Sequence, residues 1–324
     1  MTHAIVVDEI GGPEVLKWRS VESRPLGTGE IRVRQEAIGL NFIDVYFRDG
    51  TYKAPKFPFV PGKEGAGEVI ELGPDVSGIA LGDQVAYCGI DGAYAEEVVL
   101  PAAQALVLPE GVDTRTAAAM MLKGMTAEYL LRQTFPVRPG HTVLIHAAAG
   151  GVGLIAGQWA KHLGARVIGT AGSDEKCALA LEHGYDHVIN YRSADFVAAV
   201  ADLTDGRKCD VVYDSVGRDT FPQSLDCLRR RGMFVSFGQS SGKIAPFDIG
   251  ILNQKGSLFM TRPSLFGYTA TREELQACAG ALFDVVRSGA VKIRINQTFP
   301  LREAAKAHET LEARGTTGAS ILTV

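Results

Sequence analysis

The chain has 324 residues, of which 46% are hydrophobic and 22% charged, a balance typical of a globular protein with room for two ordinary domains. Its formal net charge of −4 argues against nucleic acid or an anionic membrane as a partner, because both usually recruit a basic face. No apolar run is long enough to span a membrane, the first residues lack a signal-peptide pattern, and five scattered cysteines suit a reducing compartment, so we expect a cytoplasmic protein.

The first 110 residues predict a compact, largely antiparallel β domain. Apolar and polar side chains alternate along IRVRQEAIG, residues 31–39, and Gly and Pro clusters such as GGP, PLGTGE and PFVPG interrupt the segment. A helical stretch over 114–132 then leads into the second half of the chain.

The middle of the chain alternates short apolar runs with helical patterns. Six such runs lie at 143–146, 166–170, 187–190, 210–214, 233–237 and 257–261. Between the first two, Val152, Ile155, Trp159 and Leu163 follow helical spacing up to Gly164. Because parallel strands need a crossover helix, this order predicts an α/β fold with a doubly wound, mostly parallel sheet.

Three other segments carry local signals. The basic run at 229–231 ends at Gly232 and is interpreted as a helix C-terminus, where the helix dipole favours cations. Thr271, with Glu274 three residues later, has the pattern of a capping box, so a helix is expected over 271–289. Residues 299–324 are expected to return to the first domain as a helix and a last strand.

The Gly-rich loop HAAAGGVG, residues 146–153, is the strongest functional signal. It follows a strand pattern and opens a helix pattern, which directs unpaired backbone N–H groups and the positive end of a helix toward one point. Gly150, Gly151 and Gly153 would let a pyrophosphate approach the backbone there. Glycines also mark ordinary turns, but the strand before and the helix after favour a dinucleotide loop.

The end of the second strand indicates which dinucleotide is bound. NAD-binding proteins usually place an acidic residue there, about 20 residues beyond the glycines, on the ribose 2′-hydroxyl. This chain has Gly172 and Ser173 instead, and Asp174 follows them. Ser173 and Lys176 can offer a hydroxyl and an ammonium group to a 2′-phosphate, so NADPH is expected. The alternative is a solvated helix start with Ser173 as its cap.

The segment GHTVLIHAAAGGVGLIAGQWAK, residues 140–161, resembles the signature of the zeta-crystallin-type NADPH:quinone oxidoreductases, in the zinc-independent branch of the medium-chain dehydrogenase/reductase superfamily. The similarity, strongest toward bacterial members, also covers GGPEVL at 11–16, AIGLNFIDVYFRDGTY at 37–52, VVYDSVGRDT at 211–220, FVSFGQSSG at 234–242 and LNQKGSLFMTRPSL at 252–265. It implies a GroES-like, β-rich catalytic domain over 1–124 and 266–324, a Rossmann domain over 125–265, a cleft between them and a homodimer.

The same resemblance implies which residues contact the cofactor. The nicotinamide side would be lined by Phe42, Ile43, Asp44, Val45, Tyr46 and Tyr129 and closed by Leu265, Phe266 and Arg314. The phosphates and the middle of the cofactor would lie on Gly150, Gly151, Val152, Gly153, Ser215, Gln239, Ser240, Ser241 and Gly242, and the 2′-phosphate on Gly172, Ser173, Lys176 and Tyr191. An alternative role of Tyr191 is to cover apolar surface at a strand end.

Compared with the zinc alcohol dehydrogenases of the superfamily, the chain lacks two metal ligands. Asn41 stands where those enzymes have a cysteine, and Lys63 stands where their Gly-His-Glu segment has its histidine. Of the four-cysteine structural zinc lobe, only Cys88 lies in the corresponding region. We therefore expect no metal site.

Chemistry without a metal Lewis acid favours an acceptor that is easily reduced, so the primary prediction is quinone reduction by NADPH. Asn41, Tyr46 or Tyr52 could meet developing negative charge with hydrogen bonds. The alternatives are a helix cap for Asn41, a core aromatic for Tyr46 and a loop side chain for Tyr52. The resemblance favours one-electron transfer to a semiquinone.

Two rival functions stay open at this stage. Reduction of an activated carbon–carbon double bond, in an enone or alkenal, uses the same cofactor and needs no zinc. An NADPH-binding structural or RNA-binding protein is the other, and the acidic charge balance disfavours RNA. As partner we expect a second copy of the chain, because the apolar segment GSLFMTRPSL at 256–265 would form an exposed sheet edge.

Overall fold

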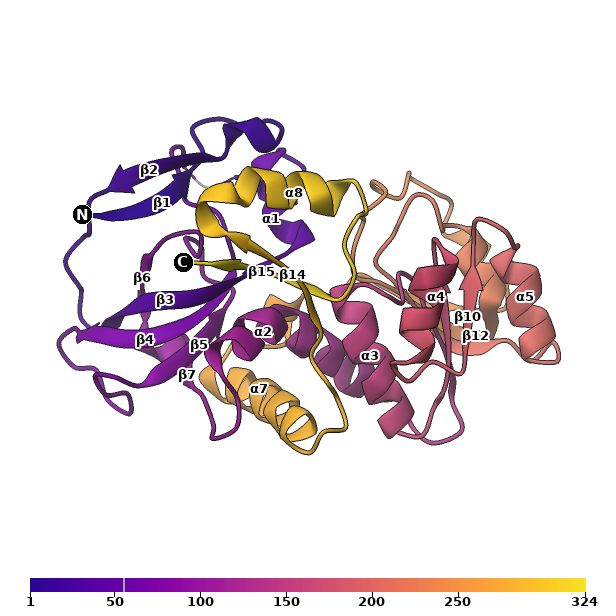
Figure 1. Ribbon diagram of the computed structural model, residues 1–324. Coiled ribbons are helices and arrows are strands. Elements are labelled where there is room, and N and C mark those ends of the chain that lie inside the picture. The colour runs from indigo at the N-terminus through magenta and orange to yellow at the C-terminus, as the bar shows by residue number, and fades with distance from the viewer. Residues whose placement is uncertain (55) are drawn as a thin grey trace. The chain divides into compact units, whose positions relative to one another are not determined.

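The chain forms two compact units in a computed structural model that describes residues 1–54 and 56–324 (Figure 1). Unit 1 comprises Met1–Lys123, Thr269–Phe283 and Ile293–Val324, and unit 2 comprises Gly124–Tyr268 and Asp284–Lys292. Residues 284–292, which the expected domain boundaries leave with the catalytic domain, group with unit 2.

Unit 1 is built on a seven-stranded sheet in the order β14-β15-β3-β4-β5-β7, with β6 also paired to β3. All of these pairs are antiparallel except β14 with β15, as the sequence led us to expect of a largely antiparallel domain. A separate antiparallel pair joins β1 and β2. The strands are β1 (Thr2–Val6), β2 (Lys17–Val21), β3 (Glu30–Leu40), β4 (Glu64–Leu72), β5 (Gln84–Cys88), β6 (Glu97–Pro101), β7 (Ala105–Val107), β14 (Ile295–Pro300) and β15 (Ala319–Thr323).

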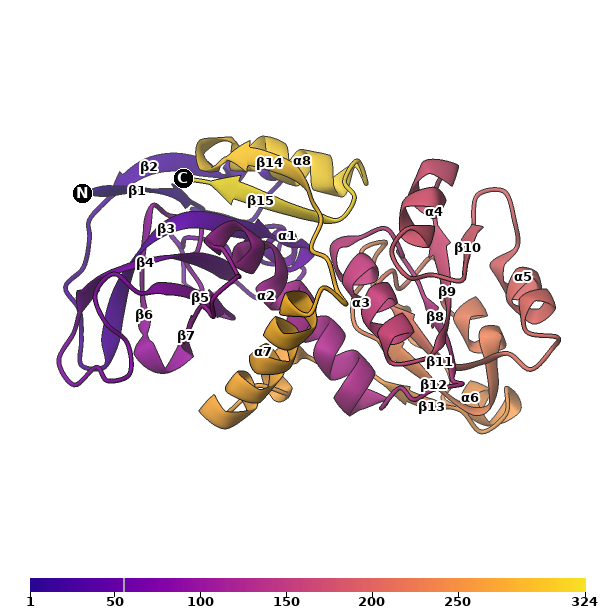
Figure 2. The same ribbon diagram turned by 60° about the horizontal axis from the view of Figure 1, so that its bottom comes forward.

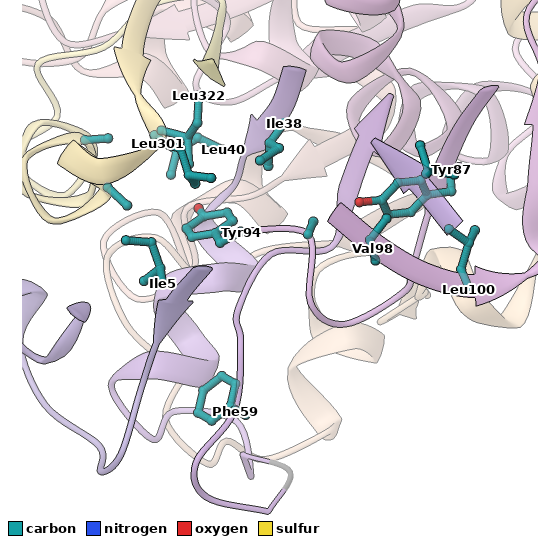
Figure 3. Packing of buried hydrophobic residues seen from close by; sticks show 14 of the residues in the cluster. Ile5, Ile38, Leu40, Phe59, Tyr87, Tyr94, Val98, Leu100, Leu301 and Leu322 are labelled. Carbon is teal, nitrogen blue, oxygen red and sulfur yellow. The ribbon is translucent and has the colours of Figure 1, made fainter. Parts of the chain in front are cut away.

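The core of unit 1 gathers apolar side chains from strands far apart in the sequence. Figure 3 shows Leu40, Leu301 and Leu322 next to the ring of Tyr94, whose phenol is fully buried. Strand β3 supplies Ile31, Val33 and Ile38 to this core, and its buried and exposed side chains alternate over 33–37, within the segment that has a period-two pattern in the sequence.

The helices of unit 1 close the sheet and lead out of it. The single-unit helices are η1 (Pro13–Val15), α1 (Phe42–Arg48), η2 (Ala102–Gln104), η6 (Leu301–Glu303) and α8 (Ala304–Glu312), while α2 (Thr114–Tyr129) and α7 (Arg272–Arg287) each continue into unit 2. The predicted capping box of α7 is confirmed: Thr271 N donates to Glu274 Oε2 (3.0 Å), and Glu274 N donates to Thr271 Oγ1 (3.2 Å). The expected return of 299–324 as helix and strand is confirmed by α8 and β15.

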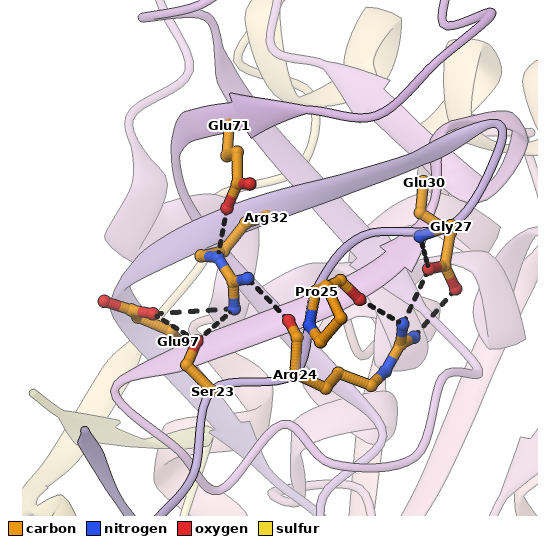
Figure 4. Close-up of polar contacts among 8 residues, drawn as sticks. All are labelled: Ser23, Arg24, Pro25, Gly27, Glu30, Arg32, Glu71 and Glu97. Atoms are coloured by element: carbon orange, nitrogen blue, oxygen red, sulfur yellow. Dashed lines mark hydrogen bonds and ion pairs between the residues drawn. The ribbon is translucent and has the colours of Figure 1, made fainter.

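A buried arginine ties the segment before β3 to two neighbouring strands (Figure 4). Arg32 Nε donates to Glu71 Oε2 on β4 (2.7 Å), and Nη2 donates to the carbonyl of Arg24 (2.7 Å). Its third nitrogen contacts Ser23 Oγ and lies 3.8 Å from Glu97 on β6. The Arg32 side chain is only 10% exposed, so water competes little for these bonds. The network therefore holds the segment at 23–24 against the strands β3, β4 and β6.

Unit 2 contains a six-stranded, wholly parallel sheet in the order β10-β9-β8-β11-β12-β13. In chain order this is 3-2-1-4-5-6, the doubly wound arrangement predicted from the sequence. The strands are β8 (Thr142–Ile145), β9 (Arg166–Ala171), β10 (His187–Asn190), β11 (Cys209–Asp214), β12 (Leu228–Ser236) and β13 (Phe259–Thr261).

Helices lie on both faces of this sheet. Figure 2 shows α3 (Gly151–His162) and α4 (Asp174–Leu181) on one side, and α5 (Phe196–Leu203) and α6 (Gly250–Gln254) on the other. The short helices η3 (Leu130–Thr134), η4 (Gln223–Cys227) and η5 (Leu265–Gly267) complete the unit. Among the described residues, none of the helices is both long and apolar enough to cross a bilayer.

The interpretation of 229–231 as a helix C-terminus is wrong. These arginines lie in β12, which follows η4 without an intervening helix. Arg231 has φ 57°, and the pairing of β11 with β12 shifts register here. Arg229 Nε donates to Asp210 Oδ1 on the neighbouring strand β11 (2.6 Å). The charge of Arg229 is therefore met by a carboxylate, where the sequence had suggested the dipole of a helix.

Candidate functional site

The Gly-rich loop leaves β8 and enters α3 in unit 2, as predicted. Ala147 adopts φ 54°, a left-handed conformation, and its carbonyl accepts from Gly150 N (2.9 Å). Ala148 N donates to Thr170 O on β9 (2.9 Å), which fastens the loop to the neighbouring strand. Gly150 is the N-cap of α3 and has no side chain to cap it. The first N–H groups of a helix have no carbonyl of their own helix to bind, and in α3 no N-cap side chain takes its place.

Gly153 is required by a close approach of backbone to backbone. A Cβ there would lie 2.4 Å from Ala147 O and 2.5 Å from Ala148 O. Gly150, Gly151 and Val152 are partly exposed, so the positive end of α3 is accessible from solvent. The loop fits a diphosphate, which needs exposed N–H groups at a helix start and a backbone that can be approached closely.

The end of β9 offers polar groups and no carboxylate of its own. Ser173 Oγ accepts from Lys176 N at 3.3 Å and so caps α4. The alternative role of Ser173, an ordinary helix cap, is thus observed. Tyr191 packs against Gly172, where a Cβ would lie 2.5 Å from the phenol oxygen. Asp174 accepts from Asn190 Nδ2 (2.7 Å), so the nearest acidic residue is held by the next strand.

Two loops at the ends of β11 and β12 bind each other. Ser240 N donates to Ser215 O (3.0 Å), and Ser241 N donates to Val216 O (2.9 Å). The Ser241 hydroxyl adds a bond to the same Val216 carbonyl (2.8 Å), and Gly242 adopts φ 118°. The structure thus brings five predicted residues to the carboxyl ends of adjacent strands, namely Ser215, Gln239, Ser240, Ser241 and Gly242.

A buried polar cluster lies beneath these loops and was missed by the sequence analysis. His146 Nδ1 is 2.8 Å from Thr170 Oγ1, and Nε2 is 2.9 Å from Ser224 Oγ. Ser224 is 3.3 Å from Asp214 Oδ2, and Asp214 Oδ1 accepts two backbone N–H bonds from the turn that follows β11. Burial lowers the pKa of His146 and so favours the neutral imidazole, although the charge of Asp214 opposes this. The cluster joins the ends of β8, β9 and β11 under the loop.

A pocket of about 520 Å³ opens beside the 238–242 loop. Arg262 donates from Nη1 to Ser236 Oγ (2.9 Å) and to Gly238 O (2.7 Å), and so shapes one wall. Of the predicted residues only Gln239 lines it; the other lining residues are Ser236, Gly238, Lys243, Ile244, Ala245, Pro246, Phe247, Met260 and Arg262.

Three further predicted residues gather elsewhere in unit 2. Tyr129, at the end of α2, is 2% exposed and stacks on Tyr268 with ring centroids 4.7 Å apart. Tyr268 directly follows η5, which contains Leu265 and Phe266. Leu265 is buried and Phe266 is 42% exposed, so within this group Phe266 is the most accessible side chain.

In unit 1, α1 presents two different faces. Phe42 and Tyr46 are half-buried, with ring centroids 6.3 Å apart, and the Tyr46 and Tyr52 rings meet edge to face at 5.2 Å. The side chains of Asp44 and Val45 point into the interior, and the two residues are only 1% and 4% exposed. Arg314 lies outside this group, exposed beyond the end of α8 with φ 58°.

Asn41 is the N-cap of α1, the alternative recognised in the sequence. Its Nδ2 donates to Glu64 Oε1 on β4 (2.7 Å), and Lys123 Nζ binds the same oxygen (2.7 Å). Lys63 pairs with Asp91, and its ammonium lies 4.5 Å from the ring centre of Phe47. The positions of the two zinc ligands thus hold an amide donor and an ammonium group, which do not fit a zinc ion.

A chain of buried polar side chains runs behind α1. Asp44, Tyr94, His308 and Arg48 are each 1% exposed or less. Burial raises the pKa of Asp44 to about 7, although hydrogen bonds from Asn41 and Tyr94 oppose this. Burial, with Arg48 adding to it, lowers the pKa of His308 to about 3. Asp44 was expected to contact the cofactor, and nothing in the sequence links it to Tyr94 or His308.

Comparisons with known proteins agree with this architecture. Two family models match, the alcohol dehydrogenase GroES-like domain over residues 27–110 and the zinc-binding dehydrogenase over 151–284. A quinone oxidoreductase of Pseudomonas aeruginosa is 53% identical, with 99% of each chain covered. The structure of Escherichia coli quinone oxidoreductase complexed with NADPH aligns with a TM-score of 0.96 at 49% identity, over 99% of this chain and 100% of that one. A 2-haloacrylate reductase of Burkholderia is 44% identical, with 99% of each chain covered.

Proposed function

Because the chain belongs to the quinone oxidoreductases of the medium-chain dehydrogenase/reductase superfamily, we propose that it reduces quinones with NADPH and without a metal ion. The observation that carries the proposal is the carboxyl edge of the unit 2 sheet. There the start of α3, the Gly172–Ser173 turn and the two loops after β11 and β12, which are hydrogen-bonded to each other, follow the carboxyl ends of neighbouring strands. A dinucleotide binds along such an edge.

Within this proposal, each strand end holds a different part of NADPH. Gly150, Gly151, Val152 and Gly153 would bind the diphosphate through backbone N–H groups. Ser173 and Lys176 would bind the 2′-phosphate, with Tyr191 against the adenine. The loops at 215–217 and 239–242 would hold the middle of the cofactor. NADPH supplies the electrons, and the protein supplies binding and orientation.

The chemistry asked of the protein is modest because a quinone is already a good electron acceptor. The aromatic surface made by Phe42, Tyr46 and Tyr52 would hold a planar ring by stacking and exclude water from it. Phenol hydroxyls of Tyr46 and Tyr52 would meet the negative charge that develops on the quinone oxygen. Asn41, whose Nδ2 binds Glu64, would contribute by holding the start of α1 in place.

A substrate panel tests the reaction class. We expect kcat/KM for 1,4-benzoquinone and 9,10-phenanthrenequinone to exceed that for 2-alkenals by at least about tenfold, a transition-state difference of about 1.4 kcal/mol. Oxygen uptake and a radical signal during turnover would support one-electron transfer, while quinol formation without a radical would contradict that part of the proposal. Preference for alkenals would overturn quinone reduction.

The second candidate is reduction of an activated carbon–carbon double bond. The 44% identity with a 2-haloacrylate reductase over nearly the whole chain favours it. The same cofactor loops would serve this reaction, so the two functions differ only in the acceptor. The panel above, extended to a 2-haloacrylate, separates them directly.

We also propose a cytoplasmic homodimer joined at the β13 edge. β13 ends the sheet order of unit 2, so one side of this strand has no strand partner within the sheet. Phe259 on β13 is 58% exposed, and Ile249 before α6 is 75% exposed. A second copy would cover such apolar groups across a two-fold axis. Sedimentation should show a dimer at micromolar concentration, and a monomer there would contradict the pairing.

A further inference from the structure

Helix α1 needs support from the rest of unit 1. It has 7 residues, and so short a helix is not stable in isolation. Its half-buried face carries Phe42 and Tyr46, the side chains proposed to face the reacting rings. Its opposite face carries Asp44 and Arg48, one helical turn apart and each 1% exposed. The position of the first face therefore depends on how the second is held.

Asp44 holds the beginning of the helix and Arg48 holds its end. Asp44 Oδ2 accepts from the N-cap nitrogen, Asn41 N, at 2.9 Å. Arg48 donates from Nη1 and Nη2 to the two oxygens of Glu312 on α8 (2.9 and 2.8 Å). Its Nε donates to Gly11 O (3.2 Å), and its own carbonyl accepts from Gly11 N (3.1 Å).

Two further side chains connect these ends. Arg48 Nη1 lies 3.1 Å from His308 Nδ1, and His308 Nε2 lies 3.0 Å from the Tyr94 oxygen. The Tyr94 hydroxyl lies 3.0 Å from Asp44 Oδ2. Tyr94 and His308 are both fully buried, and their rings meet edge to face at 5.7 Å. Four side chains therefore form one continuous line from the end of α1 back to its start.

The chemistry of these four side chains fixes which group donates and which accepts in each hydrogen bond. Arginine has no acceptor, so His308 Nδ1 must accept from Arg48. The neutral imidazole then carries its hydrogen on Nε2 and donates to the Tyr94 oxygen. Tyr94 in turn must donate to Asp44. Since Asp44 Oδ2 already accepts two hydrogen bonds, a protonated Asp44 would carry its hydrogen on Oδ1, a buried atom that has no partner among the described residues.

We propose that His308, on α8, is a positioning residue for the reaction: as the Nε2–H tautomer it links Arg48 through Tyr94 to Asp44, and so fixes both ends of the helix that presents Phe42 and Tyr46. The inference rests on the proposed function for the role of α1, but the linkage itself is a property of unit 1. It predicts that the line is strongest when Asp44 is ionised, because a carboxylate accepts more strongly than a neutral acid.

The ionisation of Asp44 therefore has a kinetic consequence. The titratable groups that face it are Tyr94, Glu64 on β4, Lys123 on α2 and Cys88 on β5, with Arg48 and His308 acting through Tyr94. We expect the kcat/KM for the quinone to rise with pH as Asp44 ionises. Removing the Tyr94 hydroxyl takes a donor from the carboxylate, so this rise should move to higher pH by about one pH unit in Tyr94→Phe.

Hydrogen exchange of full-length variants tests the linkage without any turnover. Tyr94→Phe and His308→Leu should make the amides of 41–48 exchange several-fold faster. His308→Gln should come close to the wild-type protein, because glutamine can accept from Arg48 and donate to Tyr94. Glu309→Gln, on the exposed face of the same α8 helix, is the control and should change nothing.

The outcomes separate this inference from the proposed function. Unchanged exchange at 41–48 in Tyr94→Phe, or equal damage by His308→Gln and His308→Leu, overturns the positioning role even if quinone activity is normal. If the protein reduces no quinone, faster exchange in Tyr94→Phe with rescue by His308→Gln still supports the linkage. If His308→Leu does not fold, Tyr94→Phe and His308→Gln decide the matter between them.

Discussion

Lys176 lies in the first turn of α4, after the capping Ser173 and close to the Gly172–Tyr191 contact. A hydrogen bond to a charged group contributes about 1.5–3 kcal/mol. Because Lys176 is partly exposed to solvent, we expect a value at the lower end of this range. We expect Lys176→Ala to raise the KM for NADPH about tenfold and to leave the KM for NADH unchanged. Steady-state kinetics with both cofactors measures this effect.

The control for this variant is Arg207→Ala, which removes one positive charge from the loop before β11, at the opposite edge of the sheet. It should leave both KM values unchanged. An unaltered ratio of NADPH to NADH in Lys176→Ala would contradict the assignment of the 2′-phosphate to this strand end.

Asp44 and His308 give the stability of unit 1 opposite dependences on pH. The pKa of Asp44 rises from its ordinary 3.8 to about 7 on folding, so the folded state binds more protons in this window and stability falls as pH rises. The pKa of His308 falls from 6.5 to about 3, so there the unfolded state binds more protons and stability rises with pH. Between about pH 4 and about pH 6.5 the two effects oppose each other.

Asp44→Asn removes one of these effects and leaves the other. Its free energy of unfolding should therefore rise with pH more steeply than that of the wild-type protein, by about 1 kcal/mol per pH unit in this window. Urea denaturation at about pH 4.5 and about pH 6.5 measures the difference. Parallel pH dependences of the two proteins would mean that Asp44 titrates normally in the folded state.

At the scale of elements, the entry into β3 depends on the Arg32 network (Figure 4). Arg32→Met keeps an apolar stem of similar length but loses the bonds to Glu71, Ser23 and the Arg24 carbonyl. We expect the free energy of unfolding to fall by about 1–2 kcal/mol, because Glu71 is half exposed and regains water when its partner is lost. The KM values should not change. Urea denaturation and steady-state kinetics measure the two quantities.

The matched control is Arg24→Met, in the segment that precedes β3. Arg24 makes two bonds to Glu30 (both 2.7 Å) but is 55% exposed, and exposed ion pairs contribute less than about 1 kcal/mol. A loss of stability in Arg24→Met as large as that in Arg32→Met would show that burial is not what makes the Arg32 network strong.

Elements with a strong local signal were predictable from the sequence, and contacts between distant segments were not. The six strands of unit 2 and the capping box at Thr271 follow from apolar period and cap chemistry within a few residues. The prediction of a helix C-terminus at 229–231 was wrong because it used only the local sequence, which does not show that Asp210 lies on the neighbouring strand. The line from Asp44 to His308 joins residues more than 250 positions apart, so only the tertiary fold reveals it.

At the scale of the whole molecule, the two units divide the proposed work. Unit 2 supplies the strand ends and loops for NADPH, and its sheet order matches the doubly wound pattern expected from the sequence. Unit 1 supplies the aromatic face of α1 and the polar groups that hold it. In the positions of the two zinc ligands it carries Asn41 and Lys63, which suits the proposed reduction of an acceptor that needs no Lewis acid.

Metal-free quinone reduction with NADPH is tested by the reduction of 1,4-benzoquinone by the full-length protein after exhaustive dialysis against a metal chelator, with NADPH and NADH compared in parallel. Activity should survive chelation in full, and kcat/KM should be at least about tenfold higher with NADPH. Loss of activity that added zinc restores, or a preference for NADH, would contradict this proposal.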